Sequence, residues 1–365
     1  MMRQFANFRD AFGATVLGGL LVAVGGCSGA TSEDAGSSSL DEDGESPEGA
    51  GSTGYDADPD GLTSAAGGSS GHGGDNAVGT DDEGGSTSGA SADSGPSPKA
   101  GPHPTCPDEL PEGWIFCEDF EGVYDPSLVF FDYVDAEGNF APTDEGGASG
   151  VGSMKAHYRE GVEGAGFMSV SFGSNPINTA DRPGYRDDDN FDEVYWRFRV
   201  KMQPGWPDAG PYNLSRISAF AQSDWGEALV ASVGSDDADV TLRASASSCV
   251  HNNEVECEGI DADALVPLGT LSGTTPVFSA ARAGQWQCVE AHVKLNTPGQ
   301  EDGVFEFWVD GELEASRAGM DWRGTWAAFG LNLLSIENFW LGGAPADLDR
   351  WFDDMVISTG PIGCE

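Results

Sequence analysis

Apolar and polar residues alternate without a break in Val194-Tyr195-Trp196-Arg197-Phe198-Arg199-Val200-Lys201-Met202. Successive side chains of a β-strand point to opposite faces, so this stretch presents one apolar face and one polar face. The apolar face carries Val194, Trp196, Phe198, Val200 and Met202, and the polar face carries Tyr195, Arg197, Arg199 and Lys201. The pattern predicts a strand that is buried on one side only.

The same alternation returns along the second half of the chain. Residues 287–295 place Val289, Ala291, Val293 and Leu295 on one side. Residues 304–309 and 312–316 flank Asp310-Gly311, a pair that tolerates the positive φ angles of a tight hairpin turn. Residues 239–247 and 351–358 add two more strands. Many short strands with glycine-rich turns predict an all-β protein of two stacked antiparallel sheets.

The composition divides the 365-residue chain into three parts. Residues 1–26 have a basic start and an apolar run from Phe12 to Val24, the layout of a signal peptide. Residues 27–105 consist almost wholly of Gly, Ser, Asp, Glu, Ala and Thr, which predicts a disordered acidic linker. We expect residues 106–365 to form one domain, because no second change of composition follows.

Cys27 directly follows the apolar run and two glycines. This arrangement resembles a bacterial lipobox, which implies that Cys27 is lipidated and becomes the mature N-terminus. The chain would then be held at a membrane by its lipid alone, without a spanning helix. Ser28 follows the cysteine, and this favours the outer membrane or the cell surface. The alternative is an ordinary cleaved signal in which the cysteine is incidental.

Six further cysteines are Cys106, Cys117, Cys249, Cys257, Cys288 and Cys364. An even number in an exported chain predicts disulfides, and six cysteines allow 15 pairings. Close spacing favours Cys106 with Cys117 and Cys249 with Cys257, which leaves Cys288 for Cys364. A zinc site is the alternative, but the sequence has no Cys-x-x-Cys pair to support it.

The chain carries a formal net charge of −44, from 17 Lys and Arg against 61 Asp and Glu. Binding to phosphate backbones needs a basic surface, so we expect no nucleic-acid partner. An acidic surface suits cations better, and calcium above all.

Several motifs of the C-terminal part resemble a known family, the jelly-roll polysaccharide lyases related to alginate and glucuronan lyases. They are Trp286, residues 295–299, 302–303 and 308–311, the Asn338–Gly343 segment, the Trp351–Val356 strand and the Asp119-Phe120-Glu121 triplet. The resemblance implies a concanavalin-A-like jelly roll with a polysaccharide groove on one curved sheet. The Lys-Leu-Pro-Gly segment of such lyases is replaced here by residues 213–218.

The resemblance also implies a structural calcium site. In jelly-roll carbohydrate modules the first and last strands are neighbours, and acids on them often bind this ion. The matching residues here are Asp119, Glu121, Asp353 and Asp354. Carboxylate oxygens are the ligands that calcium prefers. The alternative is that these acids are merely solvated or cap strand ends.

The polar face of residues 194–202 is predicted to line the polysaccharide groove. Arginine suits bidentate contacts with carboxylates and hydroxyls, so we expect polysaccharide to bind there. The predicted binding residues are Tyr195, Arg197, Lys294 and Trp308. The alternative is a solvated outer face, balanced by the acidic run at residues 187–189.

A lyase acting on a uronate polymer is the enzymatic alternative. β-Elimination needs a cation at the carboxylate, a base for the C5 proton and an acid for the leaving oxygen. Arg197 or Arg199 would neutralise, His292 or His157 would be the base, and Tyr195 the acid. Glycoside hydrolysis by Glu290 and Glu306 is a weaker option, because no signature of such hydrolases is present.

Polysaccharide binding without catalysis requires fewer specific residues than an enzymatic reaction, and it is the leading prediction. Exposed indoles stack on sugar rings, and we expect two or three of six tryptophans to be exposed. These six are Trp206, Trp225, Trp308, Trp322, Trp326 and Trp340, with Trp308 the best candidate. The third predicted function is that of a structural or adhesive envelope protein that binds no sugar. The sequence predicts no oligomeric state.

Overall fold

The computed structural model describes residues 106–122, 125–177, 182–236, 239–259 and 264–364. The predicted signal peptide, Cys27 and the acidic linker lie outside these residues. In the described part of the chain, no helical segment has the length and hydrophobicity of a membrane span. A short 3₁₀ helix, η1, covers Pro126–Leu128 and begins after Asp125, whose carboxylate accepts from the Ser127 N–H.

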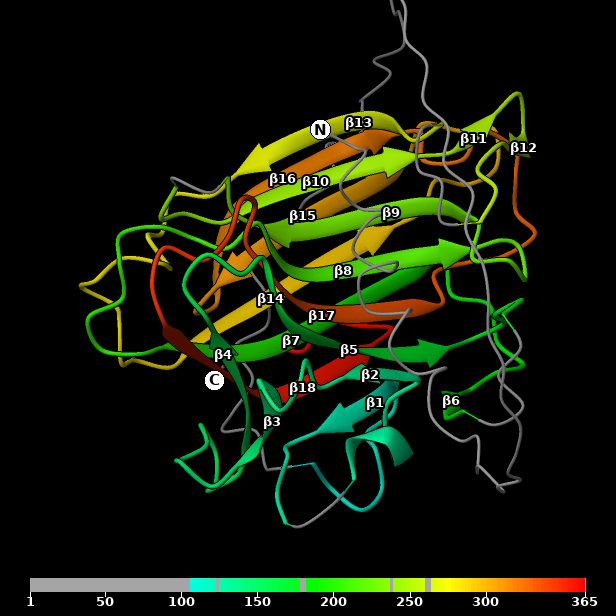
Figure 1. Cartoon of the computed structure of the whole chain (residues 1–365). Coiled ribbons are helices and arrows are strands. Elements are labelled where there is room, and N and C mark those ends of the chain that lie inside the picture. The colour runs from blue at the N-terminus through cyan, green and yellow to red at the C-terminus, as the bar shows by residue number, and fades with distance from the viewer. Residues whose placement is uncertain (1–105, 123–124, 178–181, 237–238, 260–263, 365) are drawn as a thin grey trace, which may run out of the picture. The chain divides into compact units, whose positions relative to one another are not determined.

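Two eight-stranded sheets make up the fold, and they lie as two layers in Figure 1. Sheet A has the order β16-β15-β14-β7-β18-β4-β3, with β1 also paired to β18. Its strands are β1 (Trp114–Glu118), β3 (Phe140–Thr143), β4 (Ser153–Tyr158), β7 (Glu193–Met202), β14 (Gln287–Lys294), β15 (Gly303–Val309), β16 (Glu312–Met320) and β18 (Leu348–Ser358). All pairings within sheet A are antiparallel.

Sheet B has the order β13-β10-β9-β8-β17-β5-β2, with β6 paired in parallel to β5. Its strands are β2 (Asp132–Val134), β5 (Gly164–Phe172), β6 (Gly184–Tyr185), β8 (Asn213–Phe220), β9 (Glu227–Gly234), β10 (Arg243–Ser248), β13 (Val266–Ser272) and β17 (Leu333–Phe339). A small separate hairpin joins β11 (Val250–His251) to β12 (Glu254–Val255).

The core lies between the two sheets. The alternation of residues 194–202 is confirmed: Val194, Trp196, Phe198 and Val200 of β7 are at most 1% exposed and belong to one hydrophobic cluster. The inward residues of β14 and β15 join this cluster, and so do Val170 and Ile336 from sheet B. Two antiparallel sheets that share one apolar interior confirm the expected concanavalin-A-like jelly roll.

The predicted hairpin is also confirmed. β15 and β16 are neighbours, and Val309 pairs with Glu312 across a two-residue turn. Asp310 and Gly311 have φ angles of 50° and 82°, the positive values that this turn type requires at both positions.

Three disulfides are present, in the pairing that the spacing favoured. Cys106 is bonded to Cys117, Cys249 to Cys257, and Cys288 to Cys364. The first two close short loops. The third spans 76 residues and fastens the end of the chain to β14.

Candidate functional site

A groove of about 490 Å³ lies on the face of sheet B that points away from the core. Its floor is formed by the outward side chains of β8, β9, β10 and β17, and β5 and β13 contribute at its two sides. We call it the sheet B groove. Because it crosses six adjacent strands, it offers an extended surface rather than a closed cavity.

Arg216 of β8 lies in the middle of the floor, between two carboxylates. Its Nε is 2.9 Å from Glu337 Oε1 on β17, and its Nη1 is 2.8 and 3.0 Å from the two oxygens of Glu227 on β9. The arginine side chain is 21% exposed and the two glutamates are 16% and 11% exposed. The three form a half-buried charged cluster, which we call the Arg216 cluster.

Neighbouring polar groups hold the Arg216 cluster in place. Asn213 Nδ2 donates to Glu337 at 2.7 Å, and Ser218 Oγ donates to Glu227 at 2.9 Å. Burial alone would lower the pKa of Arg216, but the charges and hydrogen bonds of the two glutamates outweigh burial and raise it. The arginine therefore stays charged, and its Nε and Nη1 groups donate to protein carboxylates.

A β-bulge decides which side chains of β8 reach the groove. The pairing of β8 with β9 shifts between Asn213 and Ser215. Leu214 and Ser215 are both fully buried, and Ser215 Oγ accepts from Trp196 Nε1 of sheet A. Arg216 is thereby turned to the opposite face, consistent with the way bulges re-aim side chains near functional sites.

Aromatic rings stand around the charged floor. Phe167, Tyr212, Trp225 and Phe339 all line the groove. Tyr212 contacts Phe339 edge to face at 6.4 Å between ring centroids. Trp225 packs on Phe220 and is held by a backbone with φ of 75°, a conformation that is uncommon outside glycine.

The β9–β10 side of the groove is polar. Ser232 and Ser245 face each other across these strands, and their hydroxyls are 2.8 Å apart. Arg243 of β10 forms an ion pair with Asp236. Hydroxyls can donate or accept, so this side can pair with ligand hydroxyl groups in either sense.

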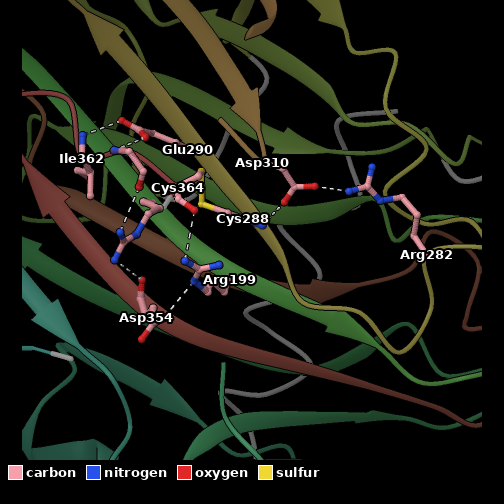
Figure 2. Close-up of a disulfide and its surroundings, with 10 residues drawn as sticks. Arg199, Arg282, Cys288, Glu290, Asp310, Asp354, Ile362 and Cys364 are labelled. Atoms are coloured by element: carbon pink, nitrogen blue, oxygen red, sulfur yellow. Dashed lines mark hydrogen bonds and ion pairs between the residues drawn. A yellow bond between two sulfur atoms is a disulfide. The ribbon is translucent and has the colours of Figure 1, made fainter. Parts of the chain in front are cut away.

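The residues that the sequence placed in a groove lie instead on sheet A, on the face opposite the core. The chain end covers part of this face. Figure 2 shows Ile362 and Cys364 against Glu290 and Arg199, with the disulfide to Cys288 beside them. We call residues 359–364 the C-terminal segment.

Buried charges hold the C-terminal segment. Glu290 accepts from the N–H groups of Ile362 and Gly363 at 2.9 and 2.7 Å. Arg197 donates to the Gly363 carbonyl at 3.1 Å, and it is only 3% exposed. Arg199 donates to the Cys364 carbonyl at 3.3 Å and pairs with Asp354 at 3.1 Å. Arg197 and Arg199 of β7 therefore contact the chain's own end, neither an open groove nor the acidic run at residues 187–189.

His292 and Tyr195 lie side by side on the same face. Their rings stack at 3.9 Å with an angle of 5°. His292 Nε2 is 3.0 Å from Glu193, and its Nδ1 is 3.7 Å from Glu306. The prediction that Trp308 is an exposed platform is wrong, because it is only 6% exposed. Of the six tryptophans considered, only Trp225 and Trp326 are partly exposed.

The remaining predicted residues are spread over sheet A. His157 pairs with Asp349 at 2.7 Å on the β4–β18 side. Lys294 ends β14, opposite Glu193. Lys201 Nζ lies 4.5 Å from the Trp286 ring and 4.9 Å from the Trp351 ring. Glu290 and Glu306 are both buried on this sheet, so they do not face each other across a groove.

Three of the four predicted calcium ligands accept hydrogen bonds from backbone N–H groups, and the fourth, Asp354, contacts side chains. Glu121 accepts from the N–H groups of Val151 and Gly152, and Asp353 from those of Ala148 and Asp354. Asp119 accepts from the Cys106 N–H at 2.9 Å, while Ser149 donates to Asp354. Among the residues described, no three His, Cys, Asp or Glu side chains are grouped as a metal site. Calcium binding stays a prediction.

No protein-family model matches the chain, and no curated protein does. Solved structures with some similarity include an endo-β-1,4-glucuronan lyase from the fungus Trichoderma reesei, with 15% identity, 67% of this chain and 94% of that chain covered, and a TM-score of 0.42. An alginate lyase from Aplysia kurodai has 11% identity and a TM-score of 0.45. The match covers 67% of this chain and 98% of that chain. A cellulose-induced protein has 18% identity and a TM-score of 0.38. The match covers 68% of this chain and 100% of that chain. Sequence identities and TM-scores this low assign no ligand to the sheet B groove, and its own side chains are the guide to what it binds.

Sequence reasoning missed every residue of the Arg216 cluster. One signal was available: Glu337 is the only charged residue in the otherwise apolar and neutral strand Leu333–Phe339. A charged residue in a strand that is buried along its whole length needs a partner. Nothing in the sequence indicated that this partner is Arg216, because the two residues are 121 positions apart.

Proposed function

We propose that this protein recognises polysaccharide and binds it in the sheet B groove. One observation carries the proposal: aromatic rings stand around a floor of fixed polar groups, in an extended groove of about 490 Å³ on one sheet. Sugar rings have apolar faces and polar edges. Aromatic side chains suit the faces, and a small number of oriented donors and acceptors suits the hydroxyls.

The fixed geometry of the floor supports recognition. Every member of the Arg216 cluster is held by at least one further hydrogen bond or ion pair within the sheet. A floor that is already ordered loses little entropy when a ligand binds. The strands that carry it are rigid elements rather than loops.

Uronate lyase activity is supported less well by this groove. Arg216, its central cation, is already paired with two carboxylates. No histidine or lysine is among the described residues that line the groove, and Tyr212 is its one phenol. Proton transfer in an elimination would therefore fall to Tyr212 or to a carboxylate of the groove, and Glu227, Glu337 and Asp236 are each already paired with an arginine.

We propose further that Cys27 carries a lipid which holds the protein at the outer membrane or the cell surface. The support is the sequence before it, an apolar run that ends in two glycines and a cysteine. The test is metabolic labelling with a fatty acid. Labelling of the wild type and its loss in Cys27→Ala are expected, and an unlabelled wild type would refute the anchor.

Affinity electrophoresis of the full-length protein, in gels that contain single polysaccharides, tests the binding proposal. We expect retardation by at least one polymer and a much weaker effect for Trp225→Ala. Trp286→Ala, directly before β14 of sheet A, is the matched control and should behave as the wild type does. Ultraviolet absorbance of unsaturated uronate product, measured with the same polymers, tests for lyase activity. Absence of retardation on every polymer would favour a structural or adhesive role.

A further inference from the structure

The charges of the sheet B groove point to a class of ligand. Two arginines and three carboxylates are among the residues that line it, so the lining carries one net negative charge. Both arginines are paired within this set, Arg216 with Glu227 and Glu337, and Arg243 with Asp236. No other described lining residue is a lysine or an arginine.

A bound uronate would meet unfavourable electrostatics at this floor. To contact Arg216, a ligand carboxylate would have to displace a glutamate that is at most 16% exposed, or approach two glutamates of the same charge. Displacement would leave a half-buried carboxylate without its partner, and approach would place like charges close together. The chain as a whole, at −44, adds a repulsive background that salt screens only in part.

A neutral sugar chain meets none of these costs. The paired carboxylates retain lone pairs that accept from sugar hydroxyls. The Ser232–Ser245 pair adds groups that donate or accept, and the rings of Tyr212 and Trp225 offer apolar surface. We infer that the sheet B groove selects neutral polysaccharides and rejects uronate polymers, with Glu227, Glu337 and Asp236 as the selecting residues. This inference rests on the proposed polysaccharide-binding function.

The test uses matched ligands that differ at one group of each sugar unit, a charged carboxylate or a neutral hydroxymethyl group. Each uronate oligosaccharide is compared with its carboxyl-reduced counterpart, in which every carboxylate has become a neutral hydroxymethyl group. Titration calorimetry of the full-length protein measures both. We expect wild type to bind at least one neutral member about tenfold or more tightly than its uronate parent. Higher salt should leave this neutral affinity unchanged.

Two variants separate selection from binding. The double variant Glu227→Gln/Glu337→Gln frees the charge of Arg216, and Asp236→Asn frees that of Arg243 at a more exposed position. We expect each to gain affinity for uronates, and this gain should weaken as salt is raised. Glu301→Gln, an exposed change outside the groove, is the control and should keep wild-type selectivity. Circular dichroism shows whether each variant is folded, and Asp236→Asn keeps the test valid if the double variant is not.

Each outcome bears on one of the two proposals. Preference of the wild type for uronates over their reduced counterparts would overturn the selectivity and leave polysaccharide binding intact. Failure of folded Asp236→Asn and of the folded double variant to gain uronate affinity would also overturn it. If the wild type binds neither member of any pair, the proposed polysaccharide binding is wrong, and the inference that rests on it is wrong as well.

Discussion

Arg216 and Glu227 form a two-oxygen ion pair across neighbouring strands of sheet B, with Nη1 2.8 and 3.0 Å from the two carboxylate oxygens. Glu337 joins from the strand on the other side. The pairing makes one unit of three charged side chains that belong to three strands. Its removal should therefore affect both the stability and the binding properties of this sheet.

Arg216→Met should lower the free energy of unfolding by about 2–4 kcal/mol at neutral pH. The reason is that it leaves two half-buried carboxylates close together without their cation. Urea unfolding followed by circular dichroism measures the loss. The triple variant Arg216→Met/Glu227→Gln/Glu337→Gln removes all three charges and should recover part of it. An Arg216→Met protein as stable as the wild type would show that the cluster does not support the fold.

The three disulfides should differ in their contribution to stability. Closing a loop restricts the unfolded chain more when the loop is longer. Cys288→Ser/Cys364→Ser removes a disulfide between residues 76 positions apart and should cost about 4.5 kcal/mol. Cys249→Ser/Cys257→Ser removes one between residues 8 positions apart and should cost about 2.5 kcal/mol. Chemical denaturation under non-reducing conditions ranks the two. Equal or reversed losses would argue against the chain-entropy account.

Glu290 should be the residue on which the C-terminal segment depends most. Glu290→Gln replaces one acceptor oxygen by a donor, so one of the N–H groups of Ile362 and Gly363 loses its partner. We expect the free energy of unfolding to fall by about 2–3 kcal/mol. Hydrogen exchange at these two N–H groups should become faster, even though the disulfide is intact. Unchanged exchange rates would mean that Cys288–Cys364 alone holds the segment.

His292 should make stability depend on pH. Burial lowers the pKa of His292, but its interactions with Glu193 and Glu306 outweigh burial and raise it above the ordinary value. A raised pKa in the folded state means that the stabilisation is complete below the ordinary histidine pKa, about 6.5, and is lost as pH rises through the raised value. The stability difference between wild type and His292→Gln should therefore be larger at about pH 6 than at about pH 9. A pH-independent difference would contradict this.

Calcium should raise the melting temperature if Glu121, Asp353 and Asp354 bind it. Each of these carboxylates accepts a hydrogen bond from the loop of residues 147–152, Glu121 from the Val151 N–H, Asp353 from the Ala148 N–H and Asp354 from the Ser149 hydroxyl. A ligand that binds only the folded state stabilises it. Thermal unfolding in calcium and in EGTA tests this, with Glu121→Gln expected to reduce the response. Identical curves in both solutions would exclude a structural calcium ion.

The alternation in residues 194–202 was enough to predict the inward face of β7, and together with the other alternating segments it predicted an all-β fold of two stacked sheets. Period-two burial is a local property, because each side chain's face follows from its place in one strand. The hairpin at Asp310-Gly311 was predictable for the same reason, since its φ angles depend on two residues. Disulfide pairing was inferred from loop spacing and elimination, and the structure has the same pairing.

Alternation alone could not show what covers the polar face of β7. Arg197 and Glu290 look like groove residues in the sequence, yet they hold residues 362 and 363 of the chain's own end. The two residues and the segment come together only when β7, β14 and the end of β18 are placed side by side. The C-terminal segment itself shows no pattern that indicates where it lies.

The sequence by itself determined strands with clear alternation, such as β7, β14 and β15, the face of each that enters the core, and the turn between β15 and β16, because these depend on neighbouring residues. Only the tertiary structure decided which sheet carries the groove. That choice depends on the pairing of β8 with β9 and β17, on a one-residue bulge before Arg216 and on the cover over sheet A. The pairing of β8 with β17 and the cover over sheet A join residues far apart in the chain, and no local pattern records such contacts.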